Sequence, residues 1–583
     1  MKDPNQKSFW LNVPLLKSPD VRLGAVLLLF SMILLFRGFN SHSSTAESAQ
    51  SHASSVSAKA NTGSATNPLS SSAAVNSDGR YSPVVDDAAL FAGCGPDNHG
   101  AFDGPFLYRC VFNYARKREL SLLDADAAQA FTRFEHKHDH DGMLDREQST
   151  KIAIVEMLAS LKQPHTKFLD VRDYQELRNH MDATLSGVGA YVMQKGVNSK
   201  LTALGSDPTK VQLREAQLIT SATAIYFWPA PLAGGPADKA GVQIGDRILK
   251  VGDQDVEGRT LFEVSQSLLG ESGTQVSVVV ERKSSGRTSE LTLHITRAAV
   301  AVPMVETEDL DADAPGTIAS VKIRGFVSKD LPITVAQSIY KLCTGVELAR
   351  TAGGGIEFGN YNPKTDCKLK GLVLDFRNDG GGRVDFATMI PQLLIDHGPL
   401  VSTFERRGDH IVETKLVLEL NTVVTETFVD GELKSAKGAD RFMSLLPPDL
   451  PIAVLINDHS ASASEMLAGL LQRHGATVVG TPSYGKEVGQ ELIPLAFGTA
   501  FKTTILKFKP GDEELGAAIM PNVEIEQSPE YLDDPMSARD QQMQKAVEVV
   551  HGLIAETAQN ANRAAMLRQK HSARDARSLQ SFN

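Results

Sequence analysis

Short apolar runs alternate with amphipathic segments from about residue 300 onward, and this alternation limits the fold more than any other feature. The runs include "GLVLDFR", "PIAVLIN" and "ATVVG", which are short and mostly apolar. Such runs are typical of strands that are buried on both faces. Between the last two lies "SEMLAGLLQRH", which has the apolar spacing of a helix. The pattern predicts an α/β core with a largely parallel sheet over residues 299–530.

The rest of the chain does not show this alternation. The whole chain has 583 residues, which allow three or four domains. The net charge of −11 and the lack of a basic stripe argue against a nucleic-acid partner. We therefore predict a multidomain α/β protein. Its other parts are a cytoplasmic segment with a membrane anchor or signal (1–40), a flexible Ser/Ala linker (41–80), a helical N-terminal domain (81–183), a β-rich domain (184–298) and a C-terminal helical tail (531–583).

An apolar run from Leu23 to Phe36 indicates export of the rest of the chain. Lys and Arg residues precede the run and are scarce after it, so the positive-inside rule places the N-terminus in the cytoplasm. We expect a single-pass anchor in the inner (cytoplasmic) membrane, with the remainder in the periplasm or outside. A cleaved signal peptide, which would make the protein secreted, is the alternative.

Four cysteines fall into two local pairs, Cys94 with Cys110 and Cys343 with Cys367. An exported chain meets oxidising conditions, so we expect two disulfides with this local connectivity. Free buried thiols are the alternative.

Ser462 lies in "SASASE", where the predicted strand "PIAVLIN" turns into a helix. Unpaired amides at a helix N-terminus favour negative charge, so a serine there can attack a carbonyl while nearby amides stabilise the oxyanion. Taken alone, the S-x-x-E spacing of Ser462 and Glu465 fits a helix capping box better. The identity of the base decides between the two interpretations.

Lys486 is the strongest candidate for that base. If "ATVVG" lies parallel beside "PIAVLIN", the loops that carry Lys486 and Ser462 meet at the carboxyl edge of the sheet, where α/β sites form. A lysine acts as a base only when an apolar pocket lowers its pKa, and a solvated surface lysine is the alternative. His474 would be roughly 18 Å along the same helix, and His459 has no obvious orienting carboxylate.

Further motifs accompany this pair. A glycine cluster, "RNDGGG", follows the strand "GLVLDF" and could present amide donors. A second motif closely resembles the centre of a PDZ domain, "GGPADKAGVQIGDRILKVGDQDV". Together with "SASASE", "YGKEVGQ" and "MLASLKQPHTKFLD", they resemble the carboxyl-terminal processing (tail-specific) proteases, which are S41 serine peptidases. The resemblance implies a PDZ-like peptide-binding domain over 184–298 and a ClpP/crotonase-like α/β protease core over 299–530.

Carried over residue by residue, the resemblance makes Ser462 the nucleophile and Lys486 the general base, with Gln490 orienting the lysine. It assigns the oxyanion hole to the amides of Gly380 and Ala463. The peptide-binding loop of the PDZ-like domain is Gly187, Val188, Gly189 and Ala190. No metal or cofactor is implied. Glu487 stands where the family usually has glycine, and a carboxylate folded inward there would raise the pKa of the lysine.

We therefore expect a serine endopeptidase that binds the C-terminal tail of an exported protein and cleaves upstream of it. Protein substrates, the membrane and an adaptor or activator are the candidate partners. A non-catalytic PDZ scaffold on a degenerate protease fold is the main alternative, and a crotonase-like acyl transferase is a weaker one. Residues 195–221 and 344–365 are predicted insertions, the first either a flap or a tolerated surface addition.

Overall fold

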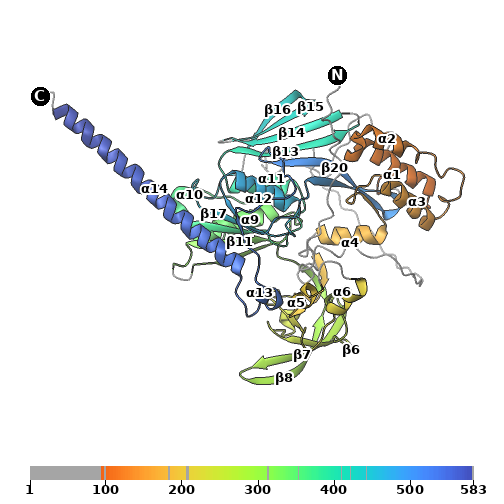
Figure 1. Cartoon of the computed structure of the whole chain (residues 1–583). Coiled ribbons are helices and arrows are strands. Elements are labelled where there is room, and N and C mark those ends of the chain that lie inside the picture. The colour runs from red at the N-terminus through yellow and green to blue at the C-terminus, as the bar shows by residue number, and fades with distance from the viewer. Residues whose placement is uncertain are drawn as a thin grey trace, which may run out of the picture.

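The computed structural model shows a helical N-terminal region, a small β domain and a two-sheet core (Figure 1). The residues that it describes are 93–97, 100–181, 184–204, 209–311, 314–351, 354–408, 410–419, 422–440 and 443–580. The predicted anchor and the whole predicted linker, residues 1–80, lie outside this part. No helix in the described ranges is long and apolar enough to cross a membrane.

The N-terminal region is a small helical body that packs against the core and adds one strand to a core sheet. Asp103 caps its first helix by accepting a hydrogen bond from the Phe106 amide at 2.9 Å, and Phe112 and Phe131 stack in its interior. Its elements are α1 (Gly104–Arg118), η4 (Leu120–Leu123), α2 (Ala125–Thr132), α3 (Glu147–Ala159), β1 (Lys167–Leu169) and α4 (Val171–Met181). β1 pairs with β20 (Ala500–Pro510) of the core, so the two bodies share a sheet.

The β domain has the strand order β3-β4-β5-β7-β8. Thr260 and Glu263 form a capping box at the start of its helix α8, which packs beside the terminal strand β3. Its elements are β2 (Thr184–Gly187), β3 (Val192–Gln194), β4 (Ile225–Phe227), α7 (Pro236–Lys239), β5 (Arg247–Val251), β6 (Gln254–Asp255), α8 (Leu261–Leu268), β7 (Gln275–Ser284), β8 (Arg287–Thr296) and β9 (Ala298–Ala301).

The predicted insertion 195–221 contributes two short helices, α5 (Val197–Thr202) and α6 (Lys210–Ala216). α5 packs against α13 (Pro529–Asp533), which follows the core. The Ser199 amide donates to Asp533, and Lys195 pairs with Asp534 at 2.7 Å. The insertion therefore joins the β domain to the C-terminal segment.

One core sheet has the order β10-β11-β12-β17-β18-β21, and all its pairs are parallel except β10 with β11. This confirms the predicted parallel α/β core. The strands are β10 (Val305–Asp309), β11 (Ile318–Ile323), β12 (Gly371–Asp375), β17 (Ile452–Ile456), β18 (Thr477–Gly480) and β21 (Val523–Glu524). The helices and 3-10 turns around it are α9 (Leu331–Thr344), α10 (Pro363–Asp366), α11 (Phe386–Met389), η5 (Ile390–Leu393) and α12 (Ala463–Arg473).

A second, antiparallel sheet lies across α12 from the first (Figure 1), and the sequence pattern did not predict it. Its strands are β13 (Gly398–Arg407), β14 (His410–Leu418), β15 (Thr422–Val429), β16 (Glu432–Asp440), β19 (Val488–Pro494) and β20, with η6 (Ala496–Gly498) between the last two. α12 contacts β17 and β18 on one side and β13 and β20 on the other. Every residue from Ala463 to Leu471 is therefore buried, and the helix can place a side chain in a dry site.

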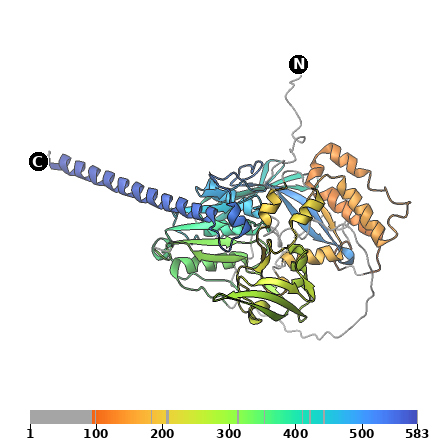
Figure 2. The ribbon, with the colours of Figure 1, turned by 60° about the horizontal axis from the view of Figure 1, so that its bottom comes forward.

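The C-terminal helix α14 (Gln541–Gln580) starts on the parallel sheet and extends away from the body (Figure 2). Its own residues Ala546 and Val550 are buried in the contact with strands β12, β17 and β18. The first turns of α14 thus cover one face of the parallel sheet.

Both predicted disulfides are present, which confirms the local connectivity over free thiols. Cys94 is bonded to Cys110, and Cys343 to Cys367. The second bond joins the two ends of the predicted insertion 344–365.

Candidate active site

Ser462 lies in a sharp turn between β17 and α12. It is the N-cap of α12 and has φ 59° and ψ −115°, a left-handed backbone that non-glycine residues rarely adopt. β17 and β18 are parallel neighbours, with Ile456 opposite Gly480, so the chain segments that follow them meet at one edge. This confirms the arrangement on which the choice of Lys486 depended. Strained turns of this kind occur at functional sites, where the surrounding structure holds them.

Glu465 connects the Ser462 turn to the Lys486 loop. Its buried carboxylate accepts the Ser462 amide at 2.7 Å and the Lys486 amide at 2.9 Å on one oxygen. The other oxygen accepts Ser483 Oγ at 2.5 Å and the Gly485 amide at 2.6 Å. The predicted capping contact therefore exists, and the same carboxylate fixes both candidate catalytic segments.

Burial alters the acid–base chemistry of Lys486. Burial is the main cause that lowers its pKa from 10.5 to about 8, and the Lys502 ammonium lowers it further, while Glu465 acts in the opposite direction. A lysine with such a pKa is partly neutral near neutral pH and can accept a proton.

Glu487 does not oppose this effect. Its carboxylate pairs with Lys507 Nζ at 3.2 Å, and Lys507 also binds Glu514 at 2.9 Å. Glu487 is not among the charges that shift the pKa of Lys486. The departure from glycine at position 487 therefore leaves the lysine able to act as a base.

The candidate catalytic contacts are open in this structure. Lys486 Nζ makes no hydrogen bond to Ser462 Oγ, and the Gln490 amide donates to the Val488 carbonyl at 3.3 Å rather than to Lys486. Ser462 is only 4% exposed. Catalytic hydrogen bonds are often loose without substrate, so these open contacts are compatible with a Ser–Lys pair.

The predicted oxyanion donors lie on either side of Ser462. Ala463 is the first residue of α12, and Gly380 is an exposed residue of the loop after β12; neither amide has a hydrogen-bond acceptor among the described residues. Gly381 makes the close contact: a Cβ added there would lie 2.4 Å from the Ala461 carbonyl and 2.8 Å from the Ala463 nitrogen. Only glycine lets this loop approach the Ser462 turn.

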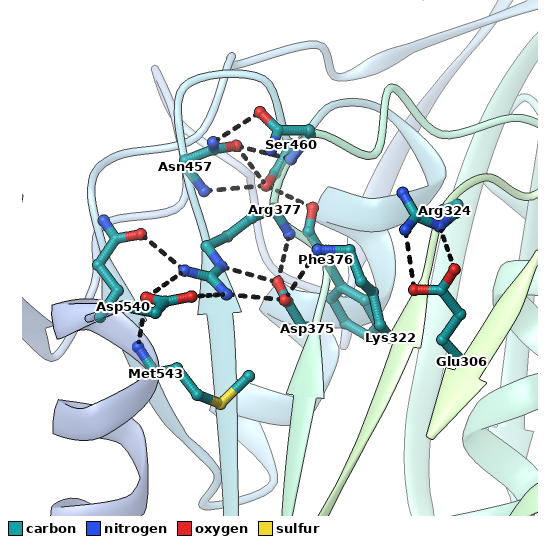
Figure 3. Close-up of polar contacts among 12 residues, drawn as sticks. Glu306, Lys322, Arg324, Asp375, Phe376, Arg377, Asn457, Ser460, Asp540 and Met543 are labelled. Carbon is teal, nitrogen blue, oxygen red and sulfur yellow. Dashed lines mark hydrogen bonds and ion pairs between the residues drawn. The ribbon is translucent and has the colours of Figure 1, made fainter. Parts of the chain in front are cut away.

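A buried ion network supports the glycine loop from below (Figure 3). Arg377 binds Asp375 through Nε and Nη2 at 2.9 and 2.8 Å, and it binds Asp540 through Nη1 and the shared Nη2, each at 2.9 Å. Burial would raise the pKa of Asp375, but the charges of Arg377 and Lys322 outweigh it and hold the pKa well below its usual range. The network ties the loop to the start of α14.

The histidines that were considered as bases lie elsewhere. His474 is at the far end of α12, where Nε2 contacts the Pro399 carbonyl at 3.2 Å. His459 Nδ1 is 3.6 Å from Asp458, and its Nε2 is buried without a partner. Within the described ranges, no hydrogen bond holds either histidine beside Ser462.

In the β domain, Gly187–Ala190 leads into β3. Val188 is buried, and its carbonyl accepts the Ala237 amide at 2.8 Å, while Gly189 has φ 69°. β3 is the terminal strand of its sheet, so its outer edge can take an added strand next to α8. The geometry suits a peptide in extended form.

Comparisons with known proteins match two parts of the chain to known families and most of it to proteases. The family model described as "Peptidase family S41" matches residues 360–525, and the "PDZ domain" model matches 229–282. A carboxy-terminal-processing protease of Bartonella bacilliformis is 28% identical over 389 residues, which is 66% of this chain and 71% of the relative. A carboxyl-terminal-processing protease of Synechocystis is 27% identical, over 71% of this chain and 79% of the relative. The solved photosystem II D1 C-terminal processing protease aligns at 22% identity over 73% and 94% of the two chains, with a TM-score of 0.39.

The two-sheet α/β core with its buried serine turn is that of a serine peptidase. The chain is an S41 peptidase with a PDZ domain, and it is similar to carboxyl-terminal processing proteases at 27 to 28% identity.

Sequence reasoning missed three residues of the site. Glu465 was seen only as a helix cap, because its contacts to Ser483, Gly485 and Lys486 come from a segment about twenty positions away. Gly381 and Asp379 were inside the quoted "RNDGGG" motif but were not singled out. The available signal for Asp379 in the sequence was an acidic residue directly before three glycines.

Proposed function

We propose that this chain cleaves exported proteins near their C-termini with a Ser462–Lys486 pair, after the PDZ domain has bound the substrate's C-terminal tail. The observation that carries the proposal is the Glu465 carboxylate, which accepts the amides of both Ser462 and Lys486. One rigid group thus sets the relative position of a nucleophile and of a base with a lowered pKa.

In this mechanism Lys486 Nζ accepts the proton as Ser462 Oγ attacks the scissile carbonyl. The amides of Ala463 and Gly380 stabilise the oxyanion, and an acyl-enzyme forms as protonated Lys486 gives its proton to the leaving amine. Water, deprotonated by Lys486, then hydrolyses the ester. Gln490 has to turn from the Val488 carbonyl toward the lysine to orient it.

Tail recognition uses Gly187–Ala190 and β3. The loop's backbone amides would hold the terminal carboxylate, and the edge of β3 would pair with the residues upstream. The tail would then hold the substrate while an upstream peptide bond enters the site at Ser462.

The experiment compares cleavage of a protein with a free C-terminal tail by the wild type, Ser462→Ala and Lys486→Ala. We expect the wild type alone to cut, and an amidated tail to raise KM. Equal cutting by all three proteins would disprove the site. Tail binding without cleavage by any protein, even with an adaptor or activator added, would favour the scaffold alternative.

We also infer that the peptidase works outside the cytoplasm, tethered by the apolar run at Leu23–Phe36. The two disulfides support an oxidising compartment. Protease treatment of spheroplasts tests this inference: added protease should digest the chain without lysis. Protection from digestion until lysis would contradict it.

A further inference from the structure

Asp379 is the one fully buried carboxyl group in the loop that faces the nucleophile, and the mechanism above gives it no role. Its backbone carbonyl accepts the Ala461 amide at 3.0 Å and Ser464 Oγ at 2.9 Å, which bracket Ser462 on both sides. Its side-chain Oδ1 accepts the Gly381 amide at 2.8 Å. A single residue thus connects the glycine loop to the nucleophile turn.

The side chain of Asp379 is poorly suited to carry a charge. It is 0% exposed, and Oδ2 is buried without any hydrogen-bond partner. An ionised carboxylate in such a place would have one N–H donor and no adjacent counter-ion. A neutral carboxylic acid keeps the bond to Gly381 at a much smaller cost.

The charged groups around Asp379 do not compensate for its burial. Lys322 from β11 is bonded to Asp375 at 3.1 Å, and Asp375 from β12 adds a repulsive negative charge. From α12 the only contribution is the Ser464 hydroxyl. Burial is the largest cause and raises the pKa of Asp379 to about 8; the Gly381 amide, Ser464 and Lys322 lower it only partly.

We propose that Asp379 is a positioning residue that acts as a neutral carboxylic acid and holds the glycine loop against the Ser462 turn, so that its ionisation at alkaline pH disrupts the oxyanion hole. Once charged, the carboxylate would seek water or a cation. Gly381 packs directly on Ser462 and Ala463, so a shift of the loop would move Gly380 away from the oxyanion. The catalytic part of this inference rests on the proposed Ser–Lys function.

The test replaces Asp379 with its neutral isostere in Asp379→Asn and records kcat/KM for a tail substrate from about pH 6 to about pH 10. For the wild type we expect an acid limb from Lys486 and an alkaline limb from Asp379. The variant should keep the acid limb and lose the alkaline limb. Asp385→Asn, which changes a half-buried acid that pairs with Arg383 on the same segment, is the matched control and should keep both limbs. An alkaline limb that persists in Asp379→Asn would overturn the proposal.

A stability measurement separates this proposal from the proposed function. The measurement uses the inactive Ser462→Ala variant. Because the pKa of Asp379 is higher in the folded state than in the unfolded state, the folded form should lose stability as pH rises from about 4 to about 8. Asp379→Asn should remove that dependence, so its Tm advantage over the parent should grow across this range. A constant Tm difference, or failure of Asp379→Asn to fold when Asp385→Asn folds, would contradict a neutral Asp379. Neither outcome depends on cleavage.

Discussion

At the scale of single residues, the surroundings of Lys486, the proposed base, lower its pKa to about 8, and Lys502 is one of the causes. Replacing Lys502 by glutamine removes a positive charge, so the Lys486 pKa should rise. We expect the acid limb of kcat/KM to move to higher pH, and the activity near pH 7 to fall about threefold to tenfold. A pH profile of peptide cleavage measures this shift.

Lys509 offers the matched control for Lys502. It lies on the same strand, β20, and pairs with Glu514 at 3.0 Å, but it is not among the charges that act on Lys486. Lys509→Gln should leave the acid limb in place. If Lys502→Gln also left it unchanged, burial alone would account for the lowered pKa.

Glu465 is the second residue whose role can be tested directly. Its carboxylate accepts four hydrogen bonds, two on each oxygen. A glutamine would set its NH2 group against two of these donors, and each buried group left unpaired costs about 1 to 3 kcal/mol. We expect Glu465→Gln to lose most of its kcat and to unfold at lower denaturant. The exposed Glu513→Gln should match the wild type, and equal kcat for both variants would contradict the positioning role.

At the scale of elements, the sequence predicted what local periodicity encodes. β17, α12 and β18 were expected because a buried parallel sheet alternates apolar runs with amphipathic helices. β13 to β16 were not expected, because strands such as Thr422–Val429 mix polar and apolar residues and gain their burial from pairing with distant strands. The same limit applies to the candidate site: Ser462 and Lys486 were predicted from local motifs, whereas the links through Glu465 required tertiary contacts.

The disulfide Cys343–Cys367 gives a prediction at this scale. It closes the insertion after α9 with a sequence separation of 24 residues, and limiting the unfolded chain in this way stabilises a fold by about 3 kcal/mol. The double variant Cys343→Ser/Cys367→Ser should therefore unfold at lower denaturant, with reductant having little further effect on this region. Peptide cleavage under native conditions should change little, because the insertion lies outside the Ser462 turn. If the double variant were as stable as the oxidised wild type, the disulfide would not stabilise the fold.

At the scale of the whole molecule, the C-terminal segment completes the peptidase core. Asp540 caps the start of α14 through the Met543 amide at 2.9 Å and also binds Arg377 beneath the glycine loop (Figure 3). Asp540→Ala would leave the buried Arg377 with one carboxylate partner. Removing one member of such a pair costs about 3 kcal/mol or more, so we expect a clear loss of stability in urea unfolding.

Asp540→Ala should also affect catalysis, because its partner Arg377 lies just before the glycine loop. Arg377 is two residues before Asp379 and three before Gly380, so a loosened guanidinium disturbs the oxyanion donors and should lower kcat more than it raises KM. Glu530→Gln, an exposed acid of the adjacent α13, is the control and should change neither constant. If Asp540→Ala raised KM and left kcat unchanged, its effect would instead come from the contacts of α13 with the insertion 195–221. Asp533 and Asp534 bind Ser199 and Lys195, and Asp540 binds Arg377. The C-terminal segment therefore contacts both the PDZ domain and the glycine loop beside Ser462.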